Sequence, residues 1–73
     1  MSSNTTTVVL DRSPTELYKI LKFEGLASSG AEAKQAVAEG RVTVNGEIET
    51  RKRKKIVAGD RIEFDNNTLL VTE

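Results

Sequence analysis

The first half of the chain carries apolar residues at helical spacing. Three of them define one face of a predicted helix: Leu17, Ile20 and Leu21. Ser13, Pro14 and Glu16 match a capping box with a proline at the first helical position. Gly25 suits the left-handed residue that ends many helices. The pattern predicts a first helix from about residue 14 to residue 24.

A second stripe, made of smaller residues, follows after a few positions: Ala33, Ala36 and Val37. Ser29 and Glu32 form another capping box before it, and Gly40 ends the predicted helix after about Glu39. A neighbouring sector of this helix is smooth except for one lysine. We call it the small-residue sector: Gly30, Ala31, Lys34 and Ala38.

The pattern changes to strand-like alternation at residues 41–44, followed by an Asn-Gly pair typical of hairpin turns. A two-residue turn there would set Val44 opposite Glu47 and leave Ile48 on the other face. The mismatch favours a turn without a clean returning strand. Residues 47–55 are then expected to form a bent or looped connection across the sheet.

The end of the chain alternates in the manner of a half-buried hairpin. A turn at residues 66–67 would set two apolar pairs opposite each other on one face: Phe64 with Leu69, and Ile62 with Val71. Residues 58–60 read as the turn that leads into this hairpin.

The beginning of the chain is rich in Ser, Thr and Asn, which is typical of a frayed terminus. We expect residues 1–12 to form a flexible N-terminal segment, frayed over residues 1–7, with a weak strand signal at residues 8–10. Residues 13–73 are expected to form one small α+β domain, in which a helix pair packs on a small, mostly antiparallel sheet.

Composition narrows the class of protein. The chain has 73 residues, no cysteine and no apolar run longer than three residues, which argues against a disulfide framework, a membrane span and a secretory signal. We therefore expect a cytoplasmic location. The absence of both His and Cys removes the usual nucleophile pairs and most transition-metal sites. We expect no catalysis, no cofactor, no metal site and no small-molecule substrate.

Charge is unevenly distributed along the chain. The 11 Lys and Arg balance the 11 Asp and Glu, yet five cations are consecutive. We call this segment the basic run: Arg51, Lys52, Arg53, Lys54 and Lys55. Taken alone, such a run is usually a solvated loop without a ligand, but it can also be a local site for a polyanion.

Two linked motifs make the sequence resemble a known family. Residues 29–46 read SGAEAKQAVAEGRVTVNG, and residues 57–62 read VAGDRI. They resemble the RNA-binding domain named after ribosomal small-subunit protein four, also called the αL motif. The resemblance covers about residues 17–64. The short length and residues 49–56 also resemble the stand-alone YbcJ-like bacterial proteins of this family.

This resemblance implies an αL-motif fold in which the helix pair and an adjacent loop cradle structured RNA. The family commonly has arginines where this chain has Gly30 and Lys34, and its first helix often opens with Arg-Leu-Asp where this chain has Glu16-Leu17-Tyr18. With the basic run as one wall of an RNA cleft, the expected RNA-binding residues are Ser29, Gly30, Lys34, Arg41, Asn45, Arg51, Lys52, Arg53, Lys54 and Lys55.

Most of these residues also have a purely structural interpretation. Ser29 can simply cap its helix, Asn45 can supply a positive φ to its turn, and Lys34 can be a solvent residue. Lys19 and Lys22 are weaker candidates for the rim. The aromatic residues do not alternate with the cations, so base stacking is not the expected mode. We predict Phe23 and Phe64 in the core and leave Tyr18 undecided.

Three functions are compatible with these features of the sequence. The first is binding to structured RNA, ribosomal or transfer RNA, through phosphate contacts and shape. The second is a protein-interaction adaptor that associates with the ribosome or an RNA-modifying enzyme without touching RNA. The third is non-specific DNA binding through the basic run.

Overall fold

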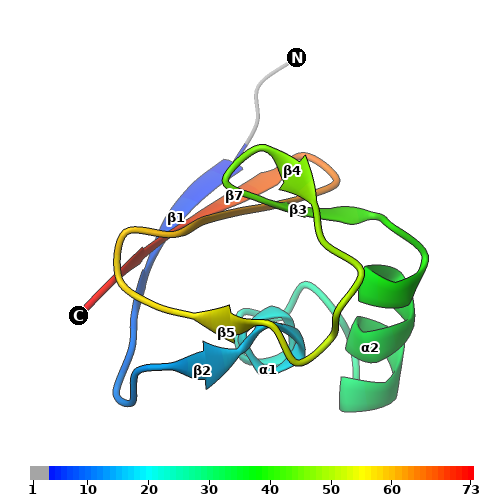
Figure 1. Ribbon diagram of the computed structural model, residues 1–73, viewed down its shortest axis with the longest axis horizontal. Coiled ribbons are helices and arrows are strands. Elements are labelled where there is room, and N and C mark those ends of the chain that lie inside the picture. The colour runs from blue at the N-terminus through cyan, green and yellow to red at the C-terminus, as the bar shows by residue number, and fades with distance from the viewer. Residues whose placement is uncertain (1–3) are drawn as a thin grey trace.

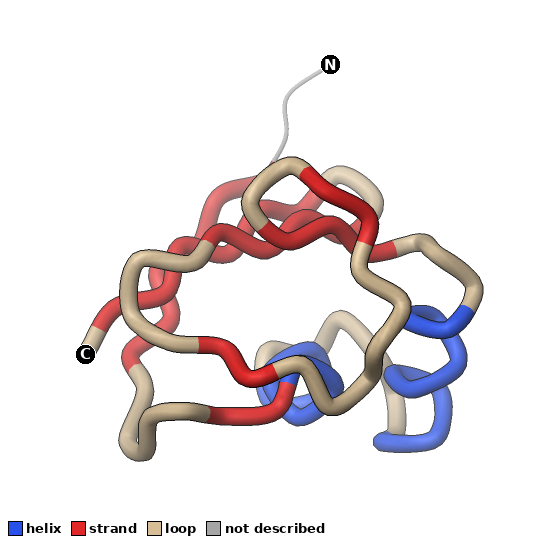
Figure 2. Tube along the Cα trace, in the orientation of Figure 1, coloured by secondary structure: helices blue, strands red, loops and turns tan. Residues whose placement is uncertain are grey.

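The computed structural model describes residues 4–73. Two helices and two sheets make up the fold (Figure 1), and loops connect them (Figure 2). The helices are α1 (Leu17–Phe23) and α2 (Gly30–Ala38). The strands are β1 (Asn4–Val9), β2 (Thr15–Glu16), β3 (Val42–Val44), β4 (Glu47–Ile48), β5 (Lys55–Ile56), β6 (Arg61–Phe64) and β7 (Asn67–Thr72).

The larger sheet has the strand order β1-β7-β6-β3-β4, and the smaller one pairs β2 with β5. Among the strand pairs of residues 4–73, only β1–β7 is parallel. Both helices and the small sheet lie on the same side of the larger sheet (Figure 1). The small α+β fold with a helix pair and a mostly antiparallel sheet is therefore confirmed.

The core fills the space between these two layers. Both predicted helix stripes are buried: Leu17, Ile20, Leu21, Ala33, Ala36 and Val37. Phe64 is buried as predicted, but the prediction for Phe23 is wrong, since 72% of its surface is exposed. At about 100° per residue, Phe23 projects roughly 110° away from the α1 stripe, toward solvent.

The predicted start of the first helix is wrong. Thr15 and Glu16 form strand β2, which pairs with β5, so α1 begins at Leu17. Glu16 occupies the N-cap position in an extended conformation and makes no side-chain capping bond. Ser13 lies before a cis peptide bond to Pro14 and does not cap the helix. Both helices end where the sequence predicted, because Gly25 and Gly40 take the left-handed conformation, with φ of 75° and 76°.

A short returning strand forms after the Asn-Gly turn, contrary to the prediction. Val44 pairs with Glu47 and Thr43 with Ile48, the register that the alternation argued against. The mismatch matters little because β4 has two residues, lies at the sheet edge and leaves Ile48 67% exposed. The chain then bends away, as expected, toward β5.

The final hairpin has the predicted faces but another register. Its turn is at residues 65–66, so Phe64 pairs with Asn67 and Ile62 with Leu69. The predicted pairs are therefore wrong by two residues on β7. A shift of two keeps every side chain on its face, and all four apolar residues remain buried.

Strand β1 begins earlier than its sequence indicated. The pattern suggested a strand only at residues 8–10, yet the chain from Asn4 to Val9 runs parallel to β7. Val8 is 6% exposed and belongs to the core. The remainder of the segment expected to fray, residues 1–3, lies outside the described residues.

Candidate nucleic-acid interface

The start of α2 is capped by its serine. Ser29 has extended backbone angles, and its hydroxyl accepts a hydrogen bond from the Glu32 amide at 3.1 Å. The reciprocal half of the predicted capping box is absent, because the Glu32 carboxylate instead accepts from the Ser28 hydroxyl. The Glu32 carboxylate is therefore held beside the helix start and remains exposed.

Tyr18 joins the small-residue sector to α1. The Lys34 ammonium lies 4.8 Å from the centre of the Tyr18 ring, within cation–π range. A Cβ atom on Gly30 would lie 3.9 Å from Cε2 of the same ring. Gly30, Lys34 and Tyr18 thus form one continuous face, which resolves the undecided position of Tyr18.

The basic run is attached to the beginning of α1 through its backbone. The Leu17 amide donates to the Lys54 carbonyl at 2.9 Å, and the Tyr18 amide donates to the Lys52 carbonyl at 3.1 Å. A further bond from the Lys54 amide to the Arg51 carbonyl, 3.1 Å long, closes a turn within the run. The run therefore satisfies two amides at the start of α1, where no side chain caps the helix.

Two mostly buried carboxylates, which we call the sheltered carboxylates, pair with arginines of the basic run. Glu49 accepts from Nε of Arg51 at 2.9 Å, and Glu16 accepts from Lys19 at 3.1 Å and pairs with Arg53 at 3.8 Å. The side-chain hydrogen bond from Arg51 is the main cause that lowers the pKa of Glu49, and the one from Lys19 lowers the pKa of Glu16.

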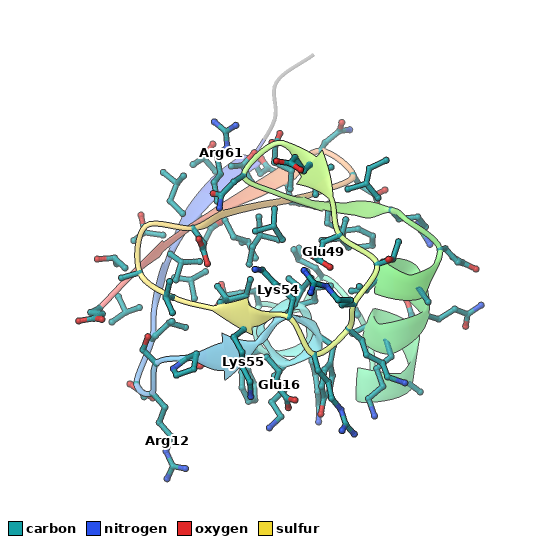
Figure 3. All side chains as sticks on the ribbon, viewed as in Figure 1. Arg12, Glu16, Glu49, Lys54, Lys55 and Arg61 are labelled. Carbon is teal, nitrogen blue, oxygen red and sulfur yellow. The ribbon has the colours of Figure 1, made fainter. Side chains whose placement is uncertain are left out.

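These carboxylates lie on two sides of β5. In Figure 3, Glu49 and Lys54 lie between the small and large sheets, whereas Glu16 lies beside Lys55 on the other side of β5. Sequence reasoning assigned no role to Glu49. Its place two residues before Arg51 is a signal that could have revealed it.

An open depression separates the basic run from the end of α2. Its lining consists of Ala38, Thr50 and the five residues of the basic run, and its volume is about 660 Å³. Ala38 belongs to the small-residue sector, so the depression brings this sector and the basic run together. Tyr18 contacts both, through its amide and its ring.

Arg41 and Asn45 do not line this depression, and their side chains contact other residues. Arg41 lies 3.7 Å from Glu39 and 3.6 Å from Asp65, and its guanidinium is over the Phe64 ring. The Asn45 side chain donates to Asp60 at 3.0 Å and accepts from the Arg61 amide at 2.9 Å. Asn45 has φ of 54°, so it has the structural role considered for its turn.

Within residues 4–73, no group of three or more acidic, His or Cys side chains could hold a metal ion. No helix in the same part of the chain is long and apolar enough to cross a membrane.

Comparisons with known proteins agree with this architecture. The family described as "S4 domain" matches residues 8–72. The "Putative RNA-binding protein YbcJ" of Escherichia coli K12 is 54% identical over 56 residues, which cover 77% of this chain and 80% of that protein. The "Uncharacterized protein YbcJ" of Shigella flexneri matches to the same extent.

A solved structure extends the comparison to the whole fold. The solution structure of YbcJ from E. coli, described as revealing an αL motif involved in RNA binding, superposes with a TM-score of 0.73. The sequences are 47% identical, and the match covers 100% of this chain and 94% of that one. On the strength of the family match and these relatives, this chain belongs to the S4 domain family and is a homologue of YbcJ.

Proposed function

We propose that this protein is a non-catalytic RNA-binding protein that docks on structured RNA through phosphate contacts and shape. The observation that carries the proposal is the ordered basic run, which is bonded to α1 and borders a depression beside α2. The name of the E. coli relative and the description of its structure support the same ligand class.

The two sides of the depression suit different parts of an RNA backbone. The basic run would contact one phosphate track, because its cations project from a backbone that is already ordered. Lys34 and the start of α2 would contact another, because the positive end of the helix dipole favours an anion there. The exposed Glu32 carboxylate at the same helix start opposes an anion, so Lys34 would carry most of this contact. Such contacts read shape rather than base sequence.

We propose ribosomal or transfer RNA as the ligand, because both offer folded helices with closely spaced phosphates. The ribosome or an RNA-modifying enzyme would then be the setting in which the protein works, in the cytoplasm. Arg41 precedes β3, beyond the end of α2, and would contact RNA at the rim, whereas Asn45 would hold the neighbouring turn through its side-chain bonds. Lys19 and Lys22 on α1 would extend the rim.

Fluorescence anisotropy titrations test this function. The protein would be titrated into labelled folded transfer RNA, a ribosomal RNA hairpin and duplex DNA of equal length at several salt concentrations. We expect folded RNA to bind more tightly than DNA at each salt concentration. Equal affinity for DNA would support non-specific binding through the basic run, and absence of RNA binding would refute the proposal.

A second function, that of a protein-interaction adaptor, is favoured by another surface. A depression of about 730 Å³ runs between the end of β1 and α1. Phe23 and Val9, which are 72% and 65% exposed, lie at this depression beside charges of both signs. Co-purification after nuclease treatment distinguishes the two functions, since a protein partner that survives removal of RNA would support the adaptor.

A further inference from the structure

One sheltered carboxylate holds one exposed arginine of the basic run. Glu49 Oε2 accepts from Nε of Arg51 at 2.9 Å and from the Arg51 backbone amide at 3.1 Å. Its other oxygen, Oε1, lies 3.4 Å from Nη2. The Glu49 side chain is 13% exposed, whereas that of Arg51 is 75% exposed. The carboxylate therefore fixes the guanidinium from the protein side.

This arrangement determines which part of the guanidinium faces solvent. A guanidinium has five N–H donors in a planar fork and can present two parallel bonds to an anion. Glu49 occupies the edge formed by Nε and Nη2. The adjacent edge, formed by Nη1 and the second hydrogen of Nη2, has no hydrogen-bond partner within residues 4–73 and can receive an anion.

We propose that Glu49 is a positioning residue that presents the Nη1–Nη2 edge of Arg51 as a bidentate site for an RNA phosphate. The proposal rests on the RNA-binding function proposed above. An arginine on an otherwise free side chain must lose rotamer freedom when it binds a phosphate, and Glu49 removes that freedom in advance.

A simple charge argument predicts the opposite effect. A carboxylate near the site repels phosphate, so its removal should strengthen binding. Two features favour positioning over repulsion. The Glu49 carboxylate is mostly buried and paired with the exposed Arg51, and Lys54 also lies close enough to Glu49 to interact with its charge. The two accounts therefore predict changes of affinity with opposite signs.

Alanine substitutions at two nearby glutamates separate these accounts. Glu47 lies two residues before Glu49 and is exposed on strand β4, so Glu47→Ala removes the same charge without touching Arg51. Affinity for folded transfer RNA would be measured for the full-length wild type, Glu49→Ala, Glu49→Gln and Glu47→Ala. We expect Glu49→Ala to bind about threefold to tenfold more weakly than wild type, which is the cost of ordering one long side chain.

We expect Glu47→Ala to bind as tightly as wild type or more tightly, and Glu49→Gln to recover part of the loss, since one amide oxygen can still accept from Nε. In the Arg51→Ala background, Glu49→Ala should have no further effect. A loss that persists there would mean that Glu49 acts through the fold and would overturn the proposal.

Two other outcomes are also decisive. If wild type binds RNA and Glu49→Ala binds as tightly as Glu47→Ala, the positioning role is refuted while the RNA-binding function stands. If wild type binds no folded RNA, both are refuted. The Nε–H signal of Arg51 in the NMR spectrum gives a check without RNA: it should be protected from exchange in wild type and broadened in Glu49→Ala.

Discussion

Asn45 connects two turns that are far apart in the sequence. Its amide side chain donates to Asp60 and accepts from the Arg61 amide, and its backbone amide donates to the Arg61 carbonyl at 2.7 Å. Asp60 in turn accepts from the Val57 amide at 2.9 Å. The β3–β4 turn and the turn before β6 are thus held by one side-chain network.

Substitutions at Asn45 should therefore affect stability more than RNA binding. Asn45→Ala removes two side-chain hydrogen bonds. It also places alanine at φ of 54°, a conformation that asparagine tolerates better. The expected cost is about 2 kcal/mol in the free energy of unfolding. Asn45→Gly relieves the φ strain and should cost less. Urea unfolding gives both values. If either variant, while folded, lost more free energy of RNA binding than free energy of unfolding, Asn45 would belong to the interface instead.

Glu49 and Glu16 make stability depend on pH. Hydrogen bonds from Arg51 and Lys19 lower the pKa values of these carboxyls in the folded state. Their contribution to stability is therefore complete above the unfolded value of about 4.3 and is lost as pH falls through the folded value.

Urea unfolding at pH 7 and at pH 3 tests this contribution. At pH 7, Glu49→Gln should unfold more easily than wild type by up to about 1 kcal/mol, since Arg51 is largely exposed to solvent. The difference should shrink as the pH falls from the unfolded value of about 4.3 through the folded value, because the protonated carboxyl loses the attraction of Arg51. A difference that does not shrink with falling pH would show that the carboxylate charge is not the cause.

At the residue scale, sequence reasoning found positions whose role is local. Ser29 caps α2, and Asn45 supplies a positive φ, because both effects depend on neighbours in the chain. It failed for Phe23, whose burial depends on the width of the α1 stripe, and for Glu49, whose role depends on where the side chain of Arg51 turns. Such roles follow from tertiary geometry.

At the scale of elements, the two helices begin in different ways. The N-terminus of α2 is capped by the Ser29 side chain, whereas that of α1 is satisfied by carbonyls of the basic run. Both starts carry the same sequence signal of a serine followed three residues later by a glutamate. The signal could not reveal that Thr15 and Glu16 are used for pairing with β5.

This difference yields a matched pair of substitutions. Ser29→Ala removes a capping bond and should cost about 1 kcal/mol in the free energy of unfolding. Ser13→Ala, at an exposed site that caps no helix, should change it by less than about 0.5 kcal/mol. Thermal or urea unfolding of the two variants would reveal this contrast, and equal losses would contradict the assignment of the caps.

Strand pairing was predicted less well than strand position. The faces of β6 and β7 follow from alternation, but their register depends on the turn at residues 65–66, where Asp65 takes φ of 54°. The pairing of β2 with β5 joins two segments of two residues each, about 40 positions apart. Segments of that length carry no periodic signal.

At the scale of the whole molecule, the fold brings the basic run and Lys34 into one region. The net charge is zero, yet the basic run and Lys34 are connected through Tyr18. The family resemblance in the sequence identified this class of fold correctly, whereas the first four residues of β1, which are Asn and Thr, gave no strand signal of their own. Long-range pairing with β7, not local preference, orders that segment.

The central claim is that RNA binds where the basic run meets α2. Two double variants of equal net charge test it: Lys34 and Arg51 changed to alanine, and Arg12 and Arg61 changed to alanine. Figure 3 shows Arg12 and Arg61 at positions well separated from Lys54. Both control cations are exposed.

The decisive measurement is the affinity of both variants for folded transfer RNA between about 50 and 200 mM salt. The first variant should bind about tenfold more weakly, and the slope of log affinity against log salt should become shallower by about 1 to 2, the loss of two phosphate contacts. The control variant should keep a slope close to that of wild type. Equal losses in both variants, or an unchanged slope in the first, would contradict the account.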